Sequence, residues 1–133
     1  MMRVRGVLAL SLASLCFAAA ESRKQQPPVL ELEITEVTAR RVENQILVDG
    51  RVRNGSGRPL QAVVLVFDFL SPDSRVVTTR KGPLEDEVLE DGQETSFHFR
   101  MPDAVRAVWF RVRAQVRGGR EPEVRNSGPH PVE

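Results

Sequence analysis

The chain has 133 residues, 28% of them charged, with 19 basic against 18 acidic residues and a formal net charge of +1. This balance excludes a strong overall field of the kind that draws a protein to nucleic acid or to an anionic membrane. The chain has one cysteine, which excludes an intramolecular disulfide, so the stability of the fold has to come from its core.

The first twenty residues have the layout of a cleavable secretory signal. Arg3 and Arg5 form a short basic region, residues 7–17 are apolar, and three alanines end at Ala20. The apolar stretch is short for a spanning helix, which needs about 20 residues, so we predict cleavage after Ala20. This signal peptide, residues 1–20, predicts a periplasmic or secreted protein with no stable membrane insertion. The 113 residues left have 17 basic against 18 acidic side chains, a net charge near −1.

Two alternatives to simple cleavage remain, an uncleaved anchor and a lipoprotein. The only cysteine, Cys16, could be lipidated, but a lipidated cysteine normally follows a small residue and Cys16 follows Leu15. The small residues before Glu21 fit ordinary cleavage better.

After a polar linker at residues 21–28, short runs of alternating apolar and polar residues are separated by turn signals. Successive side chains on a strand point to opposite faces, so each run predicts a half-buried strand. In chain order these are residues 30–35, 43–53, 60–70, 75–80, a short piece at 88–89, 95–101 and 107–116.

About seven strands at this spacing predict an all-β protein, an antiparallel β-sandwich over residues 29–117, with no significant helix after the signal peptide. The run 60–70 is apolar on both parities, as expected of a central strand, and the run 75–80 is expected at an edge. Residues 118–133 are rich in proline, glycine and charge and predict a flexible tail.

Several segments together resemble the FxLyD domain family over about residues 46–114. They are Val48-x-Gly50-x-Val52-x-Asn54, Pro59-Leu60, Val64-x-Val66-x-Asp68, Ser71-Pro72-Asp73-Ser74-Arg75-Val76-Val77 and Leu89-x-x-Gly92-Gln93-x-x-Ser96-Phe97. The chain departs from the pattern in having no tyrosine. The resemblance implies a small exported bacterial domain with an immunoglobulin-like or LEA14-like sandwich, and it supplies no catalytic residue.

Candidate binding residues lie at the outward-facing positions of the last predicted strand. The only tryptophan, Trp109, alternates there with Arg111 and Arg113. Tryptophan and arginine dominate interface hot spots, which favours a binding patch. The alternative is a Trp109 packed under the tail or a loop, with an arginine stacked on its ring. An accessible Trp109 favours binding, and a covered one favours a structural spacer.

The predicted edge strand, residues 75–80, is a second candidate surface. An extended segment of a partner protein can add a strand to such an edge. Arg75 and Val77 are the side chains expected to contact it.

The acidic segment 85–94 places six carboxylates in ten positions and is the only candidate metal site. Clustered oxygens suit calcium, but the spacing matches no EF-hand loop. The alternative is a solvated loop whose charge discourages aggregation at the sheet edge. His98 lacks the further ligands that a tetrahedral metal site requires.

No constellation of residues points to catalysis. Gly55-Ser56-Gly57 lacks the nucleophile-elbow pattern, and Asp68 is a lone interior-looking carboxylate. We therefore predict a non-enzymatic module without a cofactor, mediating a protein–protein interaction in the bacterial cell envelope. The alternatives are a structural spacer with no specific ligand, calcium binding through residues 85–94, and a hydrolase in which two of His98, Asp68 and Ser96 converge.

Overall fold

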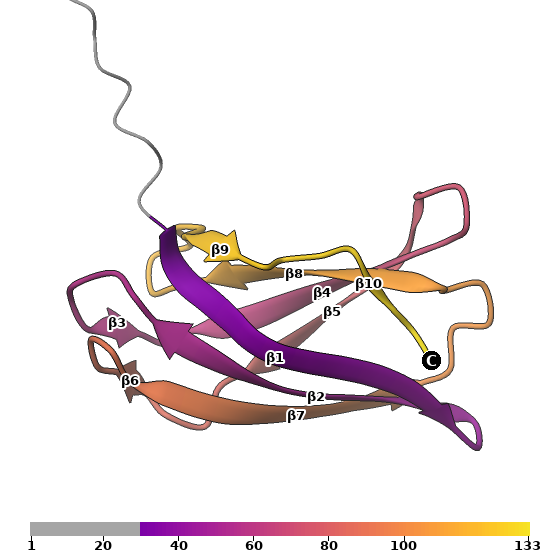
Figure 1. Cartoon of the computed structure of the whole chain (residues 1–133), viewed down its shortest axis with the longest axis horizontal. Coiled ribbons are helices and arrows are strands. Elements are labelled where there is room, and N and C mark those ends of the chain that lie inside the picture. The colour runs from indigo at the N-terminus through magenta and orange to yellow at the C-terminus, as the bar shows by residue number, and fades with distance from the viewer. Residues whose placement is uncertain (1–29) are drawn as a thin grey trace, which may run out of the picture.

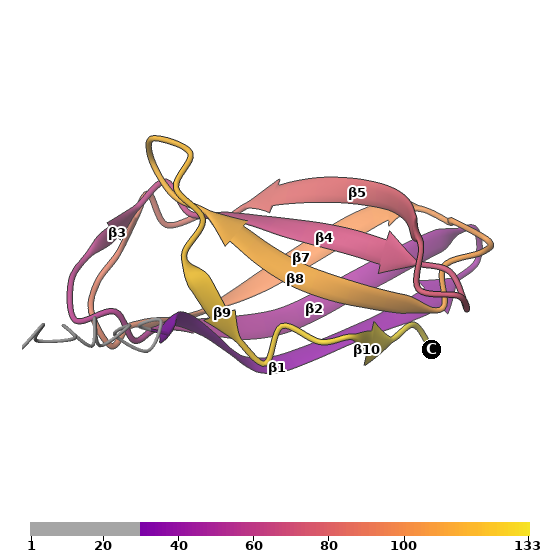
Figure 2. The same cartoon turned by 90° about the horizontal axis from the view of Figure 1, so that it is seen from above.

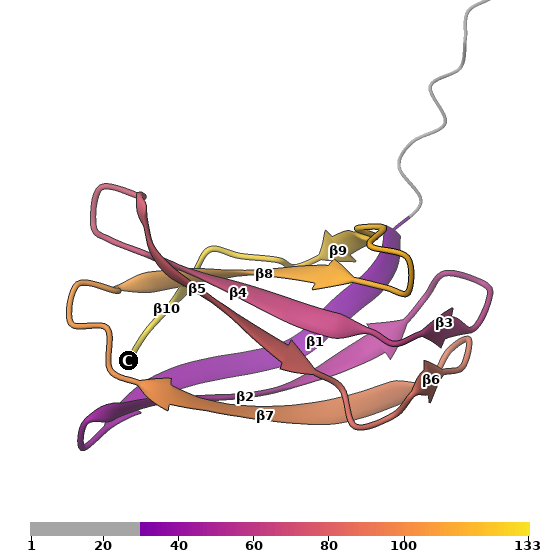
Figure 3. The ribbon, with the colours of Figure 1, turned by 180° about the vertical axis from the view of Figure 1, so that it is seen from behind.

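The computed structural model describes residues 30–133, and the predicted signal peptide and linker lie outside these residues. The described part contains ten strands and no helix, and hence no helix that could cross a membrane. Eight strands form two four-stranded sheets that pack as two layers, and the other two form a small third sheet at one end (Figures 1 and 3). The predicted all-β sandwich is confirmed, with short strands that the sequence analysis did not separate.

The first sheet has the order β7-β2-β1-β9 and consists of β1 (Leu30–Val42), β2 (Gln45–Asn54), β7 (Glu94–Pro102) and β9 (Glu123–Arg125). β1 extends well beyond the predicted run 30–35. A bulge between Ile34 and Glu36 shifts the alternation of its side chains, so the second half of the strand does not continue the pattern of the first. The buried positions accordingly step from Ile34 to Ala39, which are each 1% exposed. A reading with a fixed period of two ends the strand too early.

The second sheet has the order β10-β8-β4-β5 and consists of β4 (Val64–Leu70), β5 (Val76–Pro83), β8 (Trp109–Gln115) and β10 (His130–Pro131). β4 is central and β5 lies at the edge, as predicted for these segments. The predicted run 60–70 is interrupted at Ala62, which has φ 52° and cannot continue a strand. Its first residues form β3 (Leu60–Gln61), which pairs with β6 (Val88–Leu89) in the third sheet.

The core lies between the two larger sheets and is rich in phenylalanine. Phe67 of β4 contacts Phe97 and Phe99 of β7, with ring centroids 6.0 and 5.3 Å apart. Phe69 of β4 contacts Phe110 of β8 at 6.0 Å. Such pairs add about 1 kcal/mol beyond the area that they bury. The Phe67 contacts join the two sheets across the core, whereas Phe69 and Phe110 are neighbours within the second sheet.

The C-terminal segment is not the flexible tail that its composition predicted. β9 pairs parallel with β1 and β10 pairs antiparallel with β8, so residues 118–133 contact both sheets. At the end of the chain, the Glu133 N–H donates to Ala39 O and the Arg41 N–H donates to Glu133 O, each over 2.8 Å. These strands are two or three residues long, too short to show an alternation in sequence, so the domain includes the C-terminal segment.

The order of pairing is that of an immunoglobulin-like sandwich, with β1, β2 and β7 in one layer and β4, β5, β8 and β10 in the other. Because the chain crosses between layers, the turn after β4 and the connection between β7 and β8 meet at one end of the molecule. Figures 1 and 2 show this end opposite β3. The candidate surface lies there.

Candidate protein-binding surface

An apolar row crosses the outer face of the second sheet at the end of β4. Trp109 on β8 pairs with Leu70 on β4, and Leu70 also pairs with Val76 on β5. Paired residues share a face, here the face opposite Phe69 and Phe110, which lie in the core. Leu70 is 1% exposed, whereas Trp109 is 40% and Val76 is 60% exposed. The row therefore presents two accessible apolar side chains beside a covered leucine.

A β-bulge at the start of β5 places Val76 in this row. The pairing passes from Phe69 with Thr78 to Leu70 with Val76, which leaves Val77 as the extra residue. A bulge changes the face to which the following side chain points. Without it, Val76 would share the core side with Thr78. Val77 itself is 39% exposed at the edge.

A hollow of about 640 Å³ adjoins the row, between the turn after β4 and the connection before β8. Its apolar lining comes from Pro72, Val76, Val77, Val105 and Val108. Its charged lining is Asp73, Arg75 and Arg106, of which Asp73 and Arg75 form an ion pair over 3.2 Å. Val105 is 84% exposed on the β7–β8 connection. Exposed apolar side chains gathered around a hollow mark interaction sites. We call Val76, Val77, Val105 and Trp109 the exposed patch.

The edge strand β5 runs directly out of this hollow. β5 has a neighbour in the sheet on one side only, and six of its eight residues are exposed. Arg75, just before the strand, has a side chain that is 86% exposed. An edge of this kind offers unpaired backbone groups to an extended segment of another chain. The structure thus brings three of the predicted residues, Arg75, Val77 and Trp109, to one end of the second sheet.

The two arginines of β8 lie further along the outer face, and one of them is engaged within the domain. Arg113 forms a bidentate ion pair with Asp68, Nε to Oδ2 over 2.6 Å and Nη2 to Oδ1 over 3.1 Å. Thr79 Oγ1 also donates to Asp68 Oδ1 over 2.7 Å. The hydrogen bonds from Arg113 hold the pKa of Asp68 below its usual value. Asp68 is therefore a structural carboxylate. Both arginines are exposed, but Arg111 forms no ion pair among residues 30–133.

This pairing predicts a pH-dependent contribution to stability from Asp68. Because its pKa is lowered on folding, the contribution is present above the unfolded value, near 3.8, and is lost as pH falls through the folded value. Asp68→Asn is expected to cost about 1 kcal/mol at pH 7 and less at pH 3. Urea unfolding at both pH values measures the difference. The control is Glu85→Gln, at an exposed side chain that forms no ion pair among residues 30–133, and an Asp68→Asn cost that is unchanged at pH 3 would contradict the assignment.

The acidic segment does not gather into a metal site. No group of three or more potential metal ligands is found among residues 30–133. Asp91 Oδ1 instead accepts a hydrogen bond from the Gly57 N–H over 3.0 Å, and Glu94 pairs with Arg51 over 3.2 Å. In these contacts the carboxylates bind neighbouring loops and strands.

The three candidates for a scattered hydrolytic site do not converge. His98 is on the outer face of β7, where its Nδ1 lies 2.7 Å from Asp49 Oδ1. Ser96 is exposed on the same edge strand, whereas Asp68 faces outward from the other sheet and is held by Arg113.

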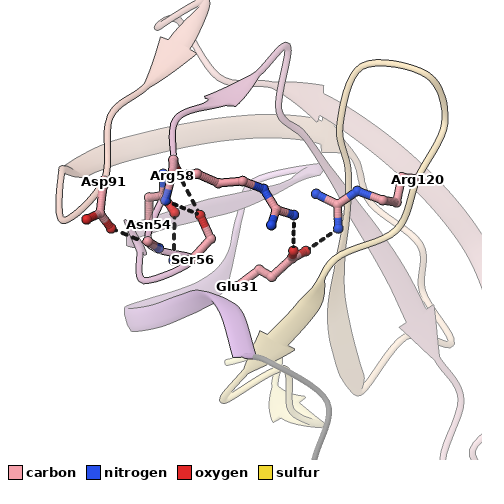
Figure 4. A network of polar contacts seen from close by, with 7 residues as sticks. Glu31, Asn54, Ser56, Arg58, Asp91 and Arg120 are labelled. Atoms are coloured by element: carbon pink, nitrogen blue, oxygen red, sulfur yellow. Dashed lines mark hydrogen bonds and ion pairs between the residues drawn. The ribbon is translucent and has the colours of Figure 1, made fainter. Parts of the chain in front are cut away.

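A buried ion cluster that the sequence analysis did not predict lies at the opposite end of the sandwich. Glu31 is at a polar position of the first predicted strand, yet its side chain is only 8% exposed. It accepts hydrogen bonds from Arg58 and Arg120, each over 2.5 Å (Figure 4). The cluster ties the start of β1 to the β2–β3 and β8–β9 loops. The two arginines satisfy the buried carboxylate, which assigns the cluster to the architecture of the domain.

Val76, Val105 and Arg106 in the hollow were not among the predicted site residues. Val105 and Arg106 lie in a connection, where no strand alternation assigns a face. An apolar valine within the polar run Pro102-Asp103-Ala104-Val105-Arg106 is the signal that could have revealed the patch.

No family model matches the chain, and no curated protein matches it in sequence. Some solved structures are similar to it. β-Glucuronidase 2 of Bacteroides uniformis is similar at 13% identity and a TM-score of 0.51, over 70% of this chain and 13% of that one. A β-glucuronidase of glycoside hydrolase family 2 is similar at 14% identity and a TM-score of 0.48, over 71% of this chain and 12% of that one. An alkylpurine DNA glycosylase of Pseudomonas fluorescens is similar at 15% identity and a TM-score of 0.42, over 71% of this chain and 30% of that one.

At these identities the likeness to the Bacteroides uniformis enzyme shows the fold alone. The chain spans a small part of that enzyme, 13% of its length. The class that the fold defines is a β-sandwich module.

Proposed function

We propose that this chain is an exported, non-enzymatic module that binds another protein of the bacterial cell envelope. It does so by pairing an extended segment of the partner with the edge of β5. The observation that carries the proposal is an exposed edge strand that leads into a hollow bordered by exposed apolar side chains. The secretory signal of the sequence and the resemblance to FxLyD domains support an envelope location.

The two parts of the surface supply different components of binding. Backbone hydrogen bonds along an added strand give affinity for any extended segment, whereas side-chain pockets give specificity. β5 offers the first, and the hollow beside Val76 and Val77 offers the second. Trp109 is accessible at 40%, which favours a binding module over a spacer that needs no apolar surface.

Site-specific photocrosslinking tests this proposal. A photoreactive amino acid at Val77, which is 39% exposed, is expected to give a discrete crosslinked partner in intact cells. The matched control is Val88, which is 37% exposed on β6 at the other end of the molecule. A crosslink from Val77 that is absent from Val88 supports binding at β5. No adduct, or the same adducts from both positions, would contradict it and favour the structural spacer.

A further inference from the structure

We propose that the segment captured by β5 is acidic and carries an apolar side chain at the end that lies over the hollow. This inference rests on the proposed function and specifies its ligand. The occupant is thus an extended acidic segment of a partner protein. The charge of the β5 edge and the apolar hollow at the start of β5 identify it.

Basic side chains lie at both ends of the edge strand β5. Arg80 and Lys81 are exposed near its far end, and Arg106 lines the hollow at its start. Among residues 30–133, none of these three side chains forms an ion pair with a carboxylate; Lys81 contacts the amide of Gln115 over 3.3 Å. Complementary charge across an interface selects the partner and speeds its approach.

The same charges disfavour a second copy of this chain as the occupant. Two β5 strands placed side by side would bring the arginines and lysine of both copies to one edge, where like charges repel. Arg80 pairs with Phe67 and so belongs to the core-facing side of an edge strand. An inward-pointing charge blunts an edge against added strands, and a second β5, which contains no carboxylate, could not neutralise it.

The geometry sets the spacing of the captured segment. Residues along a strand rise about 3.3 Å each, so Arg80 and Lys81 lie about 10 to 13 Å along β5 from Val77. A residue over the hollow and carboxylates three or four positions away would therefore meet the exposed patch and the basic pair together. Thr78 and Thr79, which lie between Val77 and the basic pair, can face many kinds of side chain on the captured segment.

Synthetic peptides of designed sequence test this inference. The probe is an eight-residue capped peptide of alternating threonine and glutamate with one leucine at either end, so that both strand directions are sampled. The first control replaces every glutamate by lysine, and the second replaces leucine by serine. Trp109 is the only tryptophan and lies in the row beside the hollow, so its emission is the readout. Hydrogen–deuterium exchange of residues 76–83 reports pairing at the edge.

We expect the glutamate peptide to bind about tenfold or more tightly than the lysine peptide at low salt, with the difference shrinking at high salt. The double variant Arg80→Glu with Lys81→Glu should reverse the preference. Val105→Ser, at a side chain that is 84% exposed, should remove the advantage of leucine over serine without affecting the fold. Equal binding and equal protection of β5 by acidic and basic peptides would overturn this inference and leave strand capture intact. Protection of β5 by no peptide would overturn both.

Discussion

Gly50→Ala is expected to lower the free energy of unfolding by about 3 kcal/mol, a cost typical of severe overpacking. Gly50 pairs with Phe97 on β7 and with Val37 on β1. A Cβ built there would lie 2.5 Å from the backbone oxygen of Glu36 and 2.5 Å from Phe97 Cζ. The first contact is with backbone at the bulge of β1, which cannot move without breaking the pairing of the two strands.

The matched control for Gly50 is Gly55→Ala. A Cβ at Gly55 meets nothing within 4 Å, and Gly55 is not among the residues with positive φ. Its substitution is expected to change stability by no more than about 0.5 kcal/mol. Urea unfolding of both variants measures the difference. Similar small effects at the two positions would show that the close approach of Phe97 to Gly50 is absent from the folded protein.

Asn54→Ala is expected to have the other large effect, again about 3 kcal/mol, because it leaves several buried polar groups without partners. The side chain is 0% exposed at the end of β2. Its Nδ2 donates to Arg58 O and Leu89 O, each over 2.8 Å, and its Oδ1 accepts from the Ser56 N–H over 2.9 Å. One amide thus joins the loop after β2 to the end of β6, as Figure 4 shows in part.

Asn44→Ala provides the comparison for Asn54. Asn44 is exposed in the turn between β1 and β2, so its replacement is expected to cost no more than about 0.5 kcal/mol. Thermal or urea unfolding distinguishes the two positions. If Asn54→Ala unfolded at the same denaturant concentration as the wild type, the amide would not be the link between the loop after β2 and β6.

These two residues explain one motif of the FxLyD resemblance in physical terms. In Gly50-x-Val52-x-Asn54, glycine admits the ring of Phe97, Val52 is 0% exposed in the core, and Asn54 closes the strand end. The motif therefore specifies packing. It indicates fold and carries no chemistry of its own.

The sequence predicted strands wherever alternation was regular and failed where the backbone departs from it. Val48 and Val52 are both 0% exposed, as the alternation of the second predicted strand required. The bulge after Ile34 and the positive φ of Ala62 each shift or interrupt the period of two, so β1 is longer and β4 shorter than expected. The C-terminal strands were missed because they are stabilised by pairing with distant strands.

The candidate surface was predicted in part. Outward parity selected Trp109, and composition selected the edge that begins near Arg75 and Val77; the structure places these three at one end of the second sheet. Arg113 was chosen by the same parity, but its guanidinium is taken by Asp68, a carboxylate two rows of pairing away from Trp109. Side-chain pairing of this kind depends on the register between strands, which the sequence does not show.

Hydrogen–deuterium exchange on the chain bound to its crosslinked partner tests the central claim most directly. The first sheet also has an exposed edge, β7, so the experiment compares residues 76–83 of β5 with residues 94–102 of β7. We predict slower exchange on binding in residues 76–83, with residues 94–102 unchanged, because strand addition pairs the amides of one edge. Slower exchange confined to residues 94–102, or no change at either edge, would contradict capture at β5.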